Sequence, residues 1–144
     1  MLTNADVTLF NKYYDCDLGR DAYKRTHLKG INWQGAKAAT VGDKGLLTDD
    51  YVEIHVPFDV YAEGKEYQRP KAWAQLKDEE KDKTFTFNNG DILVKGIIAF
   101  DLTGPKPNNL QTLRNQYDDV LQILSVVTCD YGSPELQHWE LGGK

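Results

Sequence analysis

The stretch Tyr51-Val-Glu-Ile-His-Val-Pro-Phe58 alternates apolar and polar side chains along its whole length. Successive side chains of a β-strand point to opposite faces, so this pattern predicts a half-buried strand. The apolar face carries Val52, Ile54, Val56 and Phe58, and the polar face carries Glu53 and His55. Because Pro57 has no amide hydrogen to donate to a neighbour, the strand lies at a sheet edge or ends there.

The next signal along the chain is a turn, Asn88-Asn-Gly-Asp91, between Thr84–Phe87 and the apolar run Ile92–Leu102. An Asn-Gly pair flanked by alternating apolar residues is typical of a β-hairpin. Gly96 interrupts the second arm, and a glycine inside a strand marks a bulge or a sharp bend of a small barrel. We therefore expect a hairpin with a bent second strand.

Further strands are expected on both sides of this region. At the front, the strands Val7–Tyr14 and Ala22–Trp33 are joined by a polar turn. Towards the C-terminus, Val120–Thr128 has apolar residues at both odd and even positions. Both faces of this strand are therefore apolar, which predicts a strand covered on both faces or lying centrally in the sheet. Leu136–Leu141 then pairs back with it as a final hairpin.

Helical signal is confined to two short stretches, Pro70–Lys77, with proline in its first turn, and Asn108–Asn115. Gln34–Asp50 and Gly104–Asn109 look irregular, and the first, with three glycines, is the best candidate for an interaction loop. Residues 1–144 thus form one domain of mainly β class. We expect a small antiparallel β-barrel or sandwich of six to seven strands, with one or two short helices and a long loop over about 34–50.

The net charge of −5 argues against general nucleic-acid binding. Arg20, Lys24, Arg25 and Lys29 lie within ten residues, but a solvated strand face explains them better than a stripe that binds DNA. No apolar stretch is long enough to span a membrane, so no membrane contact is expected. The first residues lack the features of a signal peptide, which makes the cytoplasm the expected site of synthesis.

The sequence contains no recognisable catalytic or metal-binding pattern of residues. His27, His55 and His138 are scattered and fit no local metal-ligand spacing, and Cys16 and Cys129 are isolated. No glycine-rich phosphate loop or activated nucleophile is recognisable, and the paired acids Asp49-Asp50 and Asp118-Asp119 are typical of solvated turns. We expect a protein that is not an enzyme and has no catalytic residue, cofactor or metal.

Several segments together carry a family resemblance. They are Met1-Leu-Thr-Asn-Ala-Asp-Val-Thr8, Arg25–Gly30, Val41-Gly-Asp-Lys-Gly45, Val52–Pro57, Asn89-Gly-Asp-Ile-Leu-Val-Lys-Gly96, Leu136-Gln-His-Trp139 and Gly142-Gly-Lys144. As a set they resemble a family of uncharacterised small proteins encoded in prophages of Gram-positive bacteria, among minor capsid and neck proteins. The order of the expected elements also resembles the head-closure (stopper) proteins of long-tailed phages.

This resemblance implies a structural protein of the virion, in the neck between head and tail. It implies a homo-oligomeric ring of six or twelve copies, with the portal and adaptor rings above and the tail terminator and tail tube below. The long loop, with Lys37, Gly42, Lys44 and Gly45, would lie in the channel and retain packaged DNA, by physical plugging rather than by charge. Both ends of the chain would form interfaces, through Met1, Leu2, Trp139 and Leu141.

Two alternatives stay open. Within the same class, the chain could be a tail terminator or another minor capsid protein. From a different class, it could be a small ligand-binding β-barrel, because such barrels hold ligands in their mouths and the chain has 8 Tyr and 3 Trp.

Overall fold

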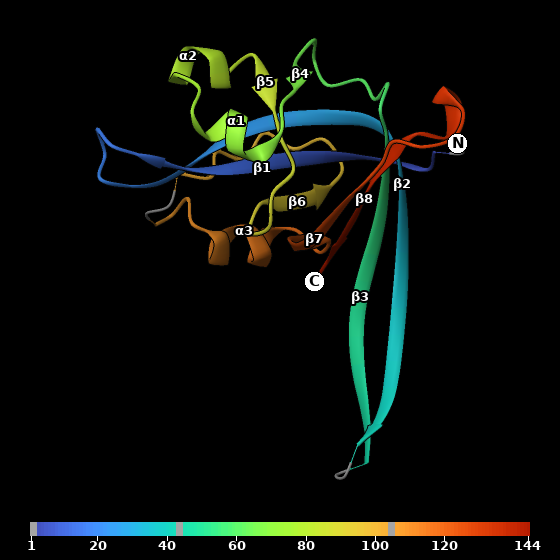
Figure 1. The fold of residues 1–144 in the computed structure, drawn as a ribbon. Coiled ribbons are helices and arrows are strands. Elements are labelled where there is room, and N and C mark those ends of the chain that lie inside the picture. The colour runs from blue at the N-terminus through green and yellow to red at the C-terminus, as the bar shows by residue number, and fades with distance from the viewer. Residues whose placement is uncertain (1–2, 43–44, 104–105) are drawn as a thin grey trace.

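The computed structural model describes the backbone of residues 3–42, 45–103 and 106–144, and the side chains of residues 3–35, 52–103 and 106–144. Six antiparallel strands close into a barrel in the order β1-β2-β3-β8-β7-β6 (Figure 1). The strands are β1 (Ala5–Asp15), β2 (Arg20–Gly42), β3 (Gly45–Pro57), β6 (Ile92–Lys95), β7 (Val120–Cys129) and β8 (His138–Gly143). The prediction of a mainly β protein built on a small antiparallel barrel is confirmed.

Short elements surround the barrel. Strands β4 (Glu66–Tyr67) and β5 (Thr84–Phe85) form a separate parallel pair; the helices are α1 (Pro70–Ala74), α2 (Asp78–Lys81) and α3 (Leu110–Gln116), with a 3-10 turn at Pro134–Leu136. Figure 1 shows α1, α2, β4 and β5 on one side of the barrel and α3 on the other. The two predicted helices are confirmed as α1 and α3, and α2 is a third.

Two clusters of buried side chains hold the fold together. All six strands fill the barrel interior, with Val7, Leu9, Leu28, Ile31, Ile54, Val56, Leu93, Leu121, Ile123, Trp139 and Leu141. A second cluster packs Leu113 of α3 against Phe10, Ile92, Val94 and Leu102. The second cluster explains why residues 7–11 of β1 are buried on both faces. The interior is therefore a packed core rather than a ligand cavity.

The C-terminal part follows the prediction closely. Strands β7 and β8 form the expected final hairpin, and β7 lies centrally between β6 and β8. Strand β3 ends at Pro57, one of the two placements expected for that proline. At Gly143 the chain passes so close to β7 that a Cβ atom would collide with the carbonyl oxygen of Gln122. Only glycine fits this crossing.

The predicted hairpin around Asn88–Asp91 is wrong. Strand β6 has only four residues and pairs with β1 and β7, while β5 pairs with β4. The turn leads into the barrel because the Asp91 carboxylate is buried against β1, where it accepts hydrogen bonds from Asn11 and from the Lys12 amide. Gly96, at φ 101°, ends the strand rather than bending it.

The expectation of a long irregular loop over Gln34–Asp50 is also wrong. These residues belong to β2 and β3, which pair without interruption from Asn32↔His55 to Gly42↔Gly45. Gly42 and Gly45 form the last described pair of the two strands, and Gly35 lies within β2. Local composition suggested a loop because glycine is rare in strands, but continuous pairing with a partner strand outweighs that preference.

Candidate functional site

The most prominent feature is a two-stranded arm, defined here as residues 36–42 of β2 and 45–51 of β3. Figure 1 shows it projecting away from the barrel. Each half has seven residues, so at about 3.3 Å per residue the arm reaches roughly 23 Å. Within the described part of the chain, the backbone of these residues pairs only across the arm, because β8 joins β3 only from Val52 onward.

The arm begins where β2 changes partner. Gly30, at φ 85°, is the extra residue of a bulge between Ala5↔Ile31 and Asp6↔Lys29, and pairing with β3 starts at Asn32. A positive φ suits glycine, and bulges bend a strand and increase its twist. The sequence therefore places a bend where the strand must leave the barrel wall.

The root of the arm is fixed firmly. The Asn4 side chain accepts a hydrogen bond from the Trp33 amide at 2.8 Å and donates one to the Trp33 carbonyl at 3.1 Å. The ammonium of Lys95 lies 5.8 Å from the centroid of the Trp33 ring, a cation–π distance. Across the hairpin, Ile54 is fully buried in the core. The arm thus leaves the barrel in a defined direction.

The predicted site residues fall in different places. Lys37, Gly42 and Gly45 are in the strands of the arm, so the structure brings them onto one element, although only their backbone is described. Lys44, Met1 and Leu2 lie outside the described residues.

The side chains of the two C-terminal interface candidates are almost fully buried. Trp139 and Leu141 are 5% and 1% exposed and belong to the barrel core. Their parity along β8 turns them inward, towards the same interior as Ile54 and Val56 of β3. The expectation that these side chains form an interface is therefore corrected.

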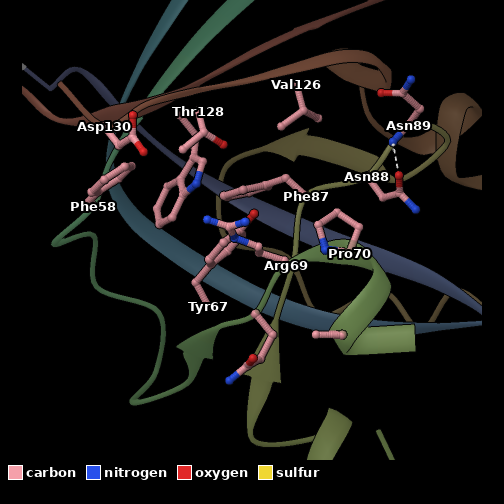
Figure 2. Close-up of a pocket in the computed structure, with 13 residues that line it drawn as sticks. Phe58, Tyr67, Arg69, Pro70, Phe87, Asn88, Asn89, Val126, Thr128 and Asp130 are labelled. Carbon is pink, nitrogen blue, oxygen red and sulfur yellow. Dashed lines mark hydrogen bonds between the residues drawn. The ribbon is translucent and has the colours of Figure 1, made fainter. Parts of the chain in front are cut away.

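A pocket of about 1020 Å³ opens where the barrel rim meets α1, and sequence reasoning missed it. Figure 2 shows Tyr67, Phe58 and Phe87 in the lining, and all three rings pack against the indole of Trp139. Ring centroids lie 4.4 Å from Trp139 for Tyr67, 4.5 Å for Phe58 and 5.3 Å for Phe87. Arg69 and Asp130 add one charge of each sign to the lining. The lining residues come from five separate segments of the chain, so no local sequence motif predicts the pocket.

Asp91 is the most perturbed carboxyl group of the described residues. Burial raises its pKa from 3.8 to about 6, although hydrogen bonds from the Lys12 amide, the Asn11 side chain and the Asn88 amide favour the charged form. The residue is 2% exposed and lines none of the described pockets. Its role is to tie the 88–91 turn to β1.

The early basic residues are largely engaged. Lys24 pairs with Asp82 at 2.8 Å, Arg25 pairs with Asp101 at 3.0 Å, and Lys29 lies over the ring of Tyr61 at 5.5 Å. A carboxylate beside a cation competes with a phosphate for it, so this cluster is a poor electrostatic footprint for DNA.

A further polar cluster lies on the outer face of the barrel, where β3 and β8 pair. His55 and His138 stack with ring centroids 5.0 Å apart, and each Nε2 lies 3.2 Å from a carboxylate oxygen, of Glu53 and Glu140 respectively. The alternation of residues 51–58 placed Glu53 and His55 together on the polar face. No local pattern placed His138 beside them. Among the described residues, His55, His138 and Glu140 form the one group that could hold a metal ion.

Comparison with known proteins gives one match. A family model described as "Family of unknown function (DUF6751)" matches residues 2–144. The chain belongs to this family. No curated protein and no solved structure matches it. No helix in the described parts of the chain is long and apolar enough to cross a membrane.

Proposed function

We propose that this chain is a structural subunit of a tailed bacteriophage, a head-closure (stopper) protein of the neck. Copies of it would form a ring of six or twelve between the portal and adaptor rings and the tail terminator. The arm is the observation that carries the proposal. A closed barrel supplies a rigid wall segment, and the arm extends roughly 23 Å beyond it.

The physics of the arm favours an assembled state. An isolated two-stranded hairpin is marginally stable in water, and its two edges leave unpaired backbone groups. An arm of this length is stabilised when a neighbouring subunit packs against it, or when several arms meet around an axis. A ring provides both arrangements.

The charge of the arm favours plugging over electrostatic capture of DNA. The segment 36–51 carries two lysines, Lys37 and Lys44, and three acids, Asp43, Asp49 and Asp50. Phosphate binding requires an excess of positive charge, whereas a plug requires only bulk in the channel. We therefore assign DNA retention to the physical presence of the arm.

The first test is composition. Purified virions of a phage that encodes this chain are expected to contain it in stoichiometric amount, measured by peptide mass spectrometry, with electron microscopy locating it at the neck. Virions that lack the protein would sink the proposal. A neck component that lies below the closure point would favour the tail-terminator alternative.

The second test removes the plug. Deleting residues 38–47 leaves Lys37 opposite Asp50, with Thr48-Asp49 as a two-residue turn. Heads carrying this variant are expected to package DNA and then lose it, measured as nuclease-sensitive DNA in the lysate. The matched variant Lys37→Ala with Lys44→Ala keeps the arm and is expected to retain DNA. Leak-free, infectious particles from the deletion variant would reject the plug. Leakage from the lysine variant would show that the positive charges of the arm, rather than its bulk, retain the DNA.

The pocket at Trp139 favours one function of a different class, the binding of a small ligand. Its aromatic walls suit a sugar ring or a planar molecule. Titration of the purified protein with mono- and oligosaccharides, followed by tryptophan fluorescence, tests this alternative. Saturable quenching that Tyr67→Ala abolishes would support it, and no response at millimolar ligand would remove it.

A further inference from the structure

We propose that His55, His138 and Glu140 form a binding site for one divalent transition-metal ion, zinc by ligand type, on the outer face of the barrel. One ligand atom from each residue lies within 4.8 Å of the other two. The site is independent of the neck assignment, because it rests on the pairing of β3 with β8 alone. Sequence spacing concealed it, since its residues come from strands more than eighty positions apart.

The strand register creates the cluster. His55 lies directly opposite Glu140, and Pro57 lies opposite His138, so His138 is the diagonal neighbour of His55. Directly opposite and diagonal side chains on one face of an antiparallel pair are within mutual reach. The inward parity of Trp139 and Leu141 keeps His138 and Glu140 outside. The barrel core thus fixes the positions from which the ligands project.

The hydrogen bonds of His138 prepare it as a ligand. Its Nδ1 lies 2.8 Å from the carbonyl oxygen of Leu136. A carbonyl only accepts, so Nδ1 carries the hydrogen and the lone pair of the neutral ring is on Nε2. A metal-bound histidine characteristically donates a hydrogen bond from its second ring N–H to a group such as a backbone carbonyl. This bond fixes the tautomer and the ring orientation.

The lone pair of His138 then faces another acceptor. Nε2 lies 3.2 Å from Oε1 of Glu140, and two acceptors at this distance repel unless a proton or a metal ion lies between them. At His55, Nε2 lies 3.2 Å from Oε1 of Glu53 and can donate a hydrogen bond to it, which leaves the Nδ1 lone pair of the neutral ring for the metal ion. One divalent cation would neutralise the two carboxylates and bind both neutral rings, which stack with planes inclined by 21°.

The ligand types and the exposure fit an open zinc site. Two imidazoles and one carboxylate leave a fourth tetrahedral position for water. The His55 and His138 side chains are 24% and 17% exposed, so an ion can enter directly from solvent. Ligand atoms around tetrahedral zinc lie about 3.3 Å apart. His138 Nε2 and Glu140 Oε1 already have this spacing at 3.2 Å, and small side-chain rotations would bring the other pairs, which lie within 4.8 Å, to the same distance. Glu53 stands beside the site as a supporting carboxylate.

The experiment uses the full chain without an affinity tag, after treatment with a chelator. Titration with zinc sulfate, followed by isothermal calorimetry, is expected to give one ion per chain. Cobalt(II) is expected to bind competitively and to show visible ligand-field bands, whereas magnesium, which prefers oxygen ligands, is expected not to compete. No binding of zinc, or one ion per two chains, would overturn the intrachain site.

Variants identify the ligands. His55→Gln, His138→Gln and Glu140→Gln are each expected to weaken zinc binding by at least about tenfold. The matched control is His27→Gln, because His27 also lies beside a carboxylate, with Nδ1 3.6 Å from Glu63, but has no second imidazole near it among the described residues. The control is expected to bind zinc like the unmodified chain. Unchanged affinity in His138→Gln would contradict the assignment.

A measurement on the unmodified chain tests the site even if one of the variants fails to fold. On addition of zinc, the imidazole NMR signals of His55 and His138 are expected to shift, while those of His27 stay in place. Equal shifts of all three histidines, or shifts of none, would overturn the proposal.

Discussion

Asp91 shows how one buried carboxylate can organise a turn at an electrostatic cost. Its two oxygens accept hydrogen bonds from Asn11, Lys12 and Asn88, and these bonds replace the β-hairpin that the Asn-Gly sequence suggested. Burial nevertheless disfavours the charged form, since transfer from water to the protein interior removes its hydration. The group therefore binds its proton more tightly in the folded chain than in the unfolded one.

This imbalance predicts a pH dependence. The unfolded chain loses the Asp91 proton near pH 3.8 and the folded chain near pH 6, so the contribution of Asp91 to stability falls as pH rises through this window. At about 1.4 kcal/mol per pKa unit, the unmodified protein should lose roughly 2 to 3 kcal/mol relative to Asp91→Asn between those limits. Urea unfolding of both proteins from pH 4 to 7 measures the difference.

A difference in unfolding free energy between the two proteins that stays constant with pH would report only the hydrogen bonds that asparagine cannot accept. The prediction is that this difference changes with pH. Parallel curves would mean that the carboxyl group is not as desolvated as its 2% exposure indicates.

At the scale of elements, the arm is separable from the barrel. Residues 36–42 and 45–51 pair through their backbones with each other. Shortening the arm by deletion of residues 38–47, with Thr48→Asn and Asp49→Gly to supply a favourable turn, is expected to leave Tm within about 3 °C of the parent. Thermal unfolding followed by circular dichroism measures this.

The control for that experiment is Leu141→Ala, which opens a cavity in the core and is expected to cost about 2 to 5 kcal/mol. A shortened arm that lowers Tm as much as Leu141→Ala would show that the arm supports the barrel. It would then be part of the folding unit rather than an appendage.

The elements also show what local pattern can and cannot predict. The alternation of residues 51–58 and the β7–β8 hairpin were predictable, because each depends on neighbours in sequence. The arm was not, because three glycines at positions 35, 42 and 45 suggest a loop until the partner strand is known. The pocket, the Asp91 network and the His55–His138 pair join distant segments, and their partners become visible only once the barrel closes.

At the scale of the whole molecule, the proposed ring requires a surface that contacts a neighbouring copy, and the outer face of β7 carries exposed apolar side chains. Leu124 and Val127 are 50% and 51% exposed on this strand. If the chain forms a neck ring, Leu124→Ser with Val127→Ser is expected to reduce its incorporation into virions, measured by quantitative mass spectrometry. The free energy of unfolding of the isolated protein should change by no more than about 0.5 kcal/mol, since both side chains are on the surface.

The matched control is Leu18→Ser, an equally exposed apolar residue, at 55%, in the turn between β1 and β2. It is expected to assemble normally. Incorporation of the β7 variant at the parental level would remove this face from the interface.

The strand order has a consequence for how the chain folds. Strands β1, β2 and β3 form one continuous meander, β6, β7 and β8 form another, and the pairings β1–β6 and β3–β8 join them. Each of these two pairings joins residues about eighty to ninety positions apart. Closing such long loops costs the most chain entropy, so we expect these pairings to form late in folding. A molecule in which they are still open exposes edges that complement the opposite half of any other copy. In a concentrated refolding mixture, we therefore expect the main folding error to be an exchange of half-barrels between two copies, which would give a dimer containing two correctly formed barrels.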